Sequence, residues 1–125
     1  MRWRGQNKMT SKELNFKLLN LLPDLKQLYF DEVSWQEGDE TGSHTMFSDV
    51  VLPYILNNIE DRGRMENVFL AVESLFELHD EYVDEVLTLS ILENIYYRGA
   101  EAQKLKQYFG TRTLKAFQEI ENTGF

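Results

Sequence analysis

The chain has 125 residues, of which 42% are hydrophobic and 27% are charged, and its formal net charge at pH 7 is −8. This length suits one globular domain with its own core, and the absence of cysteine excludes disulfides, thiolate metal sites and cysteine catalysis. The basic N-terminus has no apolar run behind it, so we expect no secretory signal and a cytoplasmic protein.

The charge is distributed unevenly along the chain. Residues 31–95 hold sixteen acidic and two basic side chains, a balance of −14, whereas residues 1–30 carry +4 and residues 96–125 carry +2. An acidic segment of this strength disfavours nucleic acid, whose phosphates are bound by Lys and Arg. It attracts a basic partner, although acidic runs also serve as solvated helix faces that keep a protein soluble.

The first two helices are marked by local signals. Thr10 begins the sequence T-S-K-E, which is typical of a capping box in which Glu13 reaches back to the Thr10 amide. Leucines at helical spacing follow, and this helix should end at Leu22 because Pro23 disfavours helical backbone at the preceding residue. Pro23 also suits the first turn of a second helix, which we expect to reach about Phe30.

Helical periodicity is lost between Asp31 and Thr45, where two glycines, five carboxylates and one tryptophan lie together. A connection of this length is more often functional or mobile than a short one. Trp35 within it either covers the core or anchors a partner.

Three helices are expected in the middle of the chain. The first runs from Met46 to Ile59, with Pro53 bending it or delaying its start. The second runs from about Arg64 to Leu78, and a short turn leads into the third, Asp80 to Arg98, so that these two pack antiparallel. The second half of the third helix is apolar on nearly every side, so we expect it to be central and covered on every side.

Two shorter helices end the chain. The first runs from Ala100 to Phe109 and stops at Gly110, which we expect in the left-handed conformation. Thr111 is expected to cap the last helix. No segment alternates at a period of two over the length of a strand. The sequence therefore predicts a frayed segment at residues 1–9 and a single all-α domain at residues 10–122, with six or seven helices in an irregular bundle or a HEAT-like stack of hairpins.

No motif of catalysis or cofactor binding is present, whether a phosphate loop, a dinucleotide fingerprint or a nucleophile elbow. His44 and His79 have no second histidine at ligand spacing, so we expect no metal. We expect Ser90 to lack a nearby base and to be a small contact point between two helices. Glu93 lies among apolar residues, so if buried it must be paired or protonated; otherwise it pairs with Arg98 or reaches solvent. We expect no catalytic residues and no cofactor.

The candidate partner-binding residues fall into two sets. The expected loop supplies Asp31, Glu32, Trp35, Glu37, Asp39 and Glu40, and the expected helix pair supplies Glu77, Asp80, Glu81, Asp84 and Glu85. Like charges four residues apart destabilise an isolated helix by a few tenths of a kcal/mol. A repeated cost of this kind suggests a use, such as binding a cationic partner.

The order of four segments resembles a family of small, uncharacterised all-helical bacterial domains. The segments are LNFKLLNLLPDL, ETGSHTMFSDVVLPYI, VFLAVESLF with EYVDEVLTLSILENI after it, and YFGTRTLKAFQEI. The single residues that accompany these segments are Pro23, Asp49, Pro53, Glu73, Glu93 and Gly110. Some small acidic helical proteins of this kind are immunity proteins of polymorphic or contact-dependent toxin systems. The resemblance, over about Leu14 to Ile120, implies binding without catalysis, with a toxin, often a basic nuclease, as partner.

Three hypotheses follow. The first is an immunity protein that binds and neutralises a cognate basic toxin, with no nucleic-acid or membrane partner. The alternative is a general helical adapter that offers a groove to a peptide or protein. The third is an enzyme that uses Glu93 and nearby carboxylates.

Overall fold

The computed structural model describes residues 9–35 and 42–123, with the side chains of residues 32–35 left aside. The elements in chain order are α1 (Ser11–Leu21), a 3-10 turn (Pro23–Leu25), α2 (Lys26–Trp35), α3 (Ser43–Met46), a π-helical segment (Phe47–Val51), α4 (Leu52–Asn57), α5 (Arg62–Phe76), α6 (Glu81–Val86), a second π-helical segment (Leu87–Leu92), α7 (Glu93–Tyr96), α8 (Ala100–Leu105), a 3-10 turn (Lys106–Tyr108) and α9 (Thr111–Thr123). Several of these adjoin, so the described residues form seven continuous helical segments and no strand. The prediction of an all-α domain with six or seven helices is confirmed.

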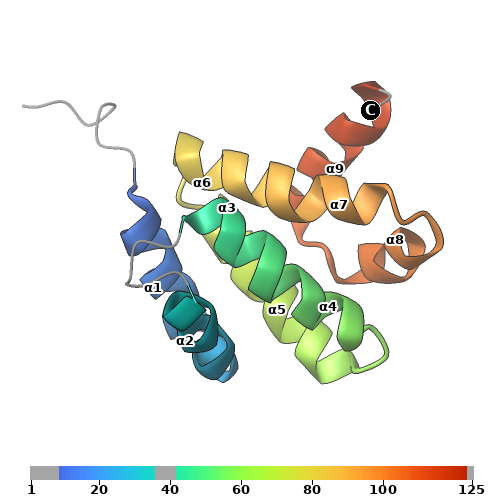
Figure 1. The fold of residues 1–125 in the computed structure, drawn as a ribbon. Coiled ribbons are helices and arrows are strands. Elements are labelled where there is room, and N and C mark those ends of the chain that lie inside the picture. The colour runs from blue at the N-terminus through green and yellow to red at the C-terminus, as the bar shows by residue number, and fades with distance from the viewer. Residues whose placement is uncertain (1–8, 36–41, 124–125) are drawn as a thin grey trace, which may run out of the picture.

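Three long helical segments, residues 43–57, 62–76 and 81–96, occupy the middle of the molecule and reverse direction at two short turns (Figure 1). The helices α1 and α2 lie at one end of this group, and α8 and α9 lie at the other (Figure 1). Each turn ends in an aspartate that caps the next helix: Asp61 accepts the Arg64 amide at 3.1 Å, and Asp80 accepts the Val83 amide at 3.0 Å.

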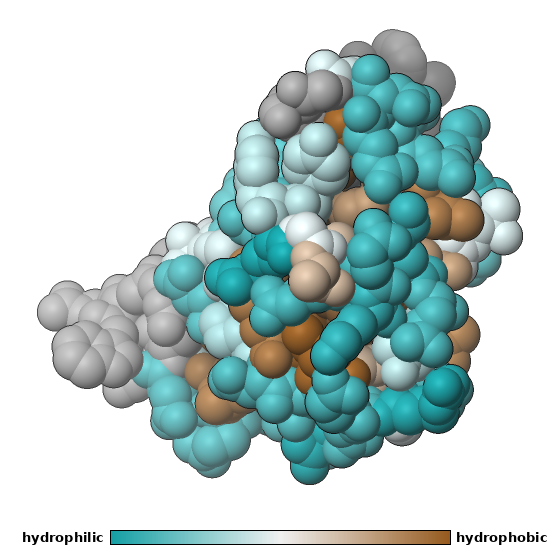
Figure 2. All heavy atoms as spheres, turned by 90° about the vertical axis from the view of Figure 1, so that its right-hand side faces the viewer, coloured by the Kyte–Doolittle hydropathy of each residue, from teal (hydrophilic) through white to brown (hydrophobic). Residues whose placement is uncertain are grey.

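One hydrophobic core joins helices that are distant in sequence. Leu18, Phe47, Phe69, Leu87 and Phe117 come from five different segments, and each is at most 1% exposed. Full burial of such a side chain contributes about 1.5–3 kcal/mol. The face formed by the α4–α5 turn and α8 is mostly hydrophilic, with apolar side chains showing in recesses between the polar ones (Figure 2).

Two local predictions for the N-terminal helices are confirmed. The Thr10 hydroxyl accepts the Glu13 amide at 3.1 Å, and the Glu13 carboxylate accepts the Thr10 amide at 2.9 Å, which completes the capping box. Helix α1 ends before Pro23, which begins the 3-10 turn into α2.

The prediction of a loop at residues 31–45 is wrong at both ends of that range. Helix α2 continues through Asp31 to Trp35, and α3 begins at Ser43. Gln27 donates to the Asp31 carboxylate at 3.0 Å from one turn earlier, and such pairs support a helix without an apolar stripe. The residues from Asp31 to Trp35 do not continue the apolar pattern of Leu25 and Leu28, so the periodicity on which the prediction depended ends before the helix does.

A π-helical segment lies just before Pro53, where the sequence predicted a bend or a delayed start of the helix. Proline has no N–H and its ring crowds the carbonyl four residues earlier, which here is that of Asp49. The turn before it widens, so the Leu52 amide reaches the Phe47 carbonyl five residues back. The helix begins before Met46, so Pro53 does not delay its start. The second π-helical segment contains no proline, and it packs against the first.

The helical segment 81–96 is not covered on every side, which corrects the expectation for this segment. Leu89 is 43% exposed, and Tyr97 just after the helix is 65% exposed. The remaining faces contact the first π-helical segment, α5, α8 and α9. No helix among the described residues has the length and apolar character needed to cross a bilayer.

The start of α9 differs from the prediction in two respects. Among the described glycines the one with a positive φ is Gly99, at 55°, and not Gly110. Thr111 is the first residue of the helix and does not cap it. The cap is Glu73 of α5, whose carboxylate accepts the amides of Arg112 and Thr113 at 2.9 and 3.0 Å.

Candidate protein-binding surface

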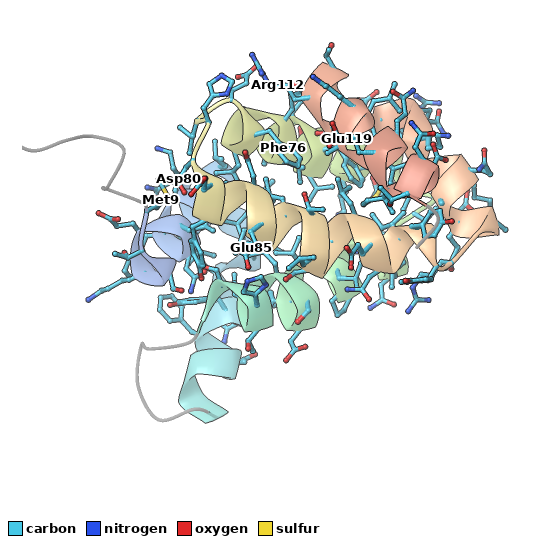
Figure 3. All side chains as sticks on the ribbon, turned by 90° about the horizontal axis from the view of Figure 1, so that it is seen from above. Met9, Phe76, Asp80, Glu85, Arg112 and Glu119 are labelled. Carbon is cyan, nitrogen blue, oxygen red and sulfur yellow. The ribbon has the colours of Figure 1, made fainter. Side chains whose placement is uncertain are left out.

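The carboxylates predicted on the helix pair lie at the end of α5, at the turn after it and within α6, and Figure 3 labels two of them, Asp80 and Glu85. Glu77 ends α5, Asp80 caps α6, and Glu81, Asp84 and Glu85 follow within α6. The short turn places two helix ends together, so these residues form one acidic region. We call it the α5–α6 acidic surface.

Asp80 belongs to the framework of this surface. One carboxylate oxygen accepts the Val83 amide and so caps α6, and the other accepts the Met9 amide at 2.7 Å. Figure 3 shows Asp80 beside Met9. Residue 9, expected to be frayed, is thereby fixed to α6. Because both oxygens are engaged, the geometry favours a structural role for Asp80 over partner binding.

Asp84 carries an unpaired oxygen. Its side chain is half-buried, and its Oδ1 is buried without a hydrogen-bond partner. Burial raises the pKa of this carboxyl above its ordinary value; His79 and Arg112 oppose the rise, whereas Asp80 adds to it. A buried carboxylate oxygen without a partner is unfavourable in the free protein, but because Oδ1 is closed to the surface, a partner cannot bond to this oxygen directly.

Glu77, Glu81 and Glu85 are exposed. The Glu85 carboxylate lies 4.0 Å from Nε2 of His44, with both side chains about half exposed. A pair in such a position contributes at most about 1 kcal/mol. Glu81 interacts with other groups of the chain. These three carboxylates remain accessible to a partner.

A polar junction next to this surface joins α3 to the segment 81–96. His44 Nδ1 lies 2.9 Å from Ser90 Oγ, and its ring packs edge-on against Tyr82. Tyr82 Oη in turn lies 2.5 Å from Ser11 Oγ. The expectation that Ser90 has no base near it is therefore wrong, whereas its role as a contact between two helices is confirmed. Ser90 is 5% exposed, so its hydroxyl is closed to a substrate and the junction is structural.

Glu93, the residue named in the enzyme hypothesis, lies at the start of α7. Its side chain is half-buried, and it lines none of the hollows described below. Within the described ranges, no three His, Asp or Glu side chains are grouped so that they could hold a metal ion.

The second predicted set does not join the first. Asp31 lies on α2, and α3 lies between α2 and α6 in both ribbon views (Figures 1 and 3). Glu32 and Trp35 belong to α2, but their side chains lie outside the description. The residues Glu37, Asp39 and Glu40 lie outside the described residues altogether.

Asp31 instead lines a hollow of about 330 Å3 between α2 and the segment 43–57, together with Asp49 and Tyr54. Sequence reasoning missed this grouping. Asp49 stood out only as a position of the resemblance, and nothing in the local pattern connects it with α2.

A wider hollow of about 800 Å3 lies between the α4–α5 turn and α8, on the side seen in Figure 2. Its cations are already paired: Lys104 Nζ is 2.8 Å from Glu60 Oε2, and the Arg62 guanidinium lies over the Tyr108 ring. This hollow therefore holds charges of both signs, three carboxylates and two cations, and its cations are engaged within the chain.

Residues 16–123 match the model of a protein family described as a domain of unknown function (DUF7674). The match spans 108 of the 125 residues, since 123 − 16 + 1 = 108. No curated protein and no solved structure matches the chain. The expected membership of an uncharacterised family is confirmed, and the description of the family makes no reference to toxins or immunity.

Proposed function

The chain belongs to this family of unknown function, and we propose that it is a non-enzymatic protein-binding domain, namely an immunity protein that neutralises a cognate basic toxin. The α5–α6 acidic surface would contact the toxin. A cationic cleft that binds the phosphates of a substrate is the type of surface that such an inhibitor would occlude.

The observation that carries this proposal is the set of exposed carboxylates at the end of α5 and within α6, namely Glu77, Glu81 and Glu85. An Arg or Lys of a partner would form charge-assisted hydrogen bonds with them. The same carboxylates would speed the encounter.

The balance of −14 over residues 31–95 supports the same class of partner. Electrostatic attraction between such a segment and a basic protein raises the association rate and falls with ionic strength. We therefore expect association that is fast at low salt and slower at high salt.

The partner can be sought by affinity capture of the tagged protein from its native cells, washed at low and then at high salt, with mass spectrometry of the bound material. One stoichiometric partner that is lethal alone and harmless with this protein would support immunity. Many weak partners without toxicity would contradict it and favour a general helical adapter.

The contact surface is then tested by two charge-matched double variants. Glu81→Gln with Glu85→Gln should slow association with the captured partner by roughly tenfold at low salt. Glu60→Gln with Glu101→Gln changes the net charge equally at the far end of the molecule, by the α4–α5 turn and α8, and should leave the rate nearly unchanged. Equal slowing in both double variants would mean that the association rate depends on net charge alone, and it would contradict the assignment of the α5–α6 acidic surface as the contact surface.

A further inference from the structure

The hollow between α2 and the segment 43–57 combines an apolar part with two carboxylates. Leu28, Val50 and Pro53 form the apolar part, and Asp31 and Asp49 are the carboxylates. We call it the Asp31–Asp49 pocket. Its volume of about 330 Å3 is at the small end of the range for ligand sites, roughly 300–1,000 Å3, and suits one long side chain.

The pocket offers hydrogen-bond acceptors with capacity to spare. Asp31 receives one bond from Gln27 at 3.0 Å, and Asp49 receives one from the Ser48 hydroxyl at 3.2 Å. A carboxylate can accept about four. Among the described residues that line the pocket, none is Lys or Arg. The negative charge is therefore not neutralised from within the pocket lining.

Tyr54 adds an aromatic side chain in an acidic setting. Burial raises the pKa of its phenol above the ordinary value, and although Arg64 opposes this, Asp24 and Asp61 add to the rise. The phenol is therefore neutral at pH 7, as it is at the ordinary value. Arg64, the cation in this group, lies 3.4 Å from the Asp61 carboxylate and donates to Oδ1 of Asn58, which lines the pocket, at 2.8 Å.

We propose that the Asp31–Asp49 pocket receives an arginine side chain of a protein partner. The guanidinium has five N–H donors in a plane, binds carboxylates in a bidentate manner and stacks on aromatic rings. The ammonium of lysine is a compact charge without this planar arrangement of donors. The aliphatic stem would cover Leu28 and Val50, of which Leu28 is 45% exposed. This inference rests on the proposed function in so far as the arginine belongs to a protein, but it concerns a different surface from the α5–α6 acidic surface.

The test is a titration of the full-length protein with N-acetyl-arginine amide, followed by amide chemical shifts in NMR. Saturable shifts are expected at Val50 and Tyr54. N-acetyl-lysine amide should bind about threefold more weakly, because it lacks the planar fork. Asp31→Asn with Asp49→Asn should weaken the arginine probe roughly tenfold, as charge-assisted hydrogen bonds are lost.

Two further variants make the result decisive. Glu77→Gln with Glu85→Gln removes the same charge at the α5–α6 acidic surface and should leave the titration unchanged. Tyr54→Leu should reduce the preference for arginine over lysine. An unchanged affinity in the Asp31, Asp49 double variant, with its thermal midpoint retained, would overturn the proposal, as would equal affinity for the two probes. Since no partner protein enters this titration, its failure leaves the immunity proposal standing, and failure of the capture experiment leaves the pocket standing.

Discussion

The carboxylate of Glu73 on α5 occupies the space into which any side chain at position 110 would project. A Cβ built on Gly110 would lie 2.5 Å from Cδ and 2.7 Å from Cγ of Glu73. The same carboxylate accepts the Thr113 hydroxyl at 2.8 Å and the first free amides of α9. Gly110 is therefore required for close approach, and its backbone φ is not positive.

This relationship predicts non-additive stability effects. Gly110→Ala should lower the free energy of unfolding by about 1–2 kcal/mol, because Glu73 must leave the amides that it caps. Glu73→Ala should cost a similar amount. The double variant should cost about 1 kcal/mol less than the sum, because the new methyl group then has room. Urea unfolding of the four proteins measures this coupling.

Gly63→Ala is the matched control for that cycle. A Cβ at this position would meet its nearest neighbour, Asp61, at an ordinary 3.7 Å. Gly63 lies in the first turn of α5, so alanine should leave stability unchanged or raise it slightly. Simple additivity between Gly110→Ala and Glu73→Ala would contradict the close-approach explanation.

The Glu73 cap also predicts a dependence of stability on pH. Burial would raise the pKa of Glu73, but the amides of Arg112 and Thr113 and the Thr113 hydroxyl outweigh it and lower the pKa below 4.5. A lowered folded-state pKa contributes stability that is fully present above the unfolded value and is lost as pH falls through the folded value. The stability difference between the native protein and Glu73→Gln should therefore be largest near pH 7 and shrink below about pH 4.5. A difference independent of pH would show that charge has no part in the cap.

Asp84 predicts the opposite sign. Its pKa is raised above 3.8, chiefly by burial, so the folded protein holds this proton more tightly than the unfolded chain. The resulting destabilisation is absent below the unfolded value and develops as pH rises through the folded value. Asp84→Asn should thus stabilise the free protein at pH 7 by about 1 kcal/mol, and this gain should vanish below about pH 3.8. Thermal unfolding across pH measures it, with exposed Glu81→Gln as a control that changes stability by less than about 0.5 kcal/mol.

Asp80 and Glu81 are adjacent in sequence but should behave differently. Asp80→Ala removes the α6 cap and the acceptor of the Met9 amide, so it should cost about 1 kcal/mol or more. Hydrogen exchange at the Met9 and Val83 amides should accelerate in this variant and remain unchanged in Glu81→Gln. Retained protection of the Met9 amide in Asp80→Ala would show that another group holds residue 9.

Sequence reasoning succeeded where the interacting groups lie within a few residues of one another. The Thr10–Glu13 capping box spans three positions, and Pro23 constrains the residue just before it, so both boundaries of α1 were predictable. The extension of α2 past Asp31 was missed because the residues from Asp31 to Trp35 do not continue an apolar stripe.

The tertiary structure alone decided how distant carboxylates are used. Glu73 caps a helix 40 positions further on, and Asp80 binds an amide 71 positions earlier. Asp31 and Asp49 line one pocket because two helices pack beside each other. In sequence all four are acidic residues in an acidic segment. Local patterns indicate which hydrogen bonds a residue can accept or donate. Which partner forms the bond depends on how the helices pack, and the packing is determined by the shared hydrophobic core.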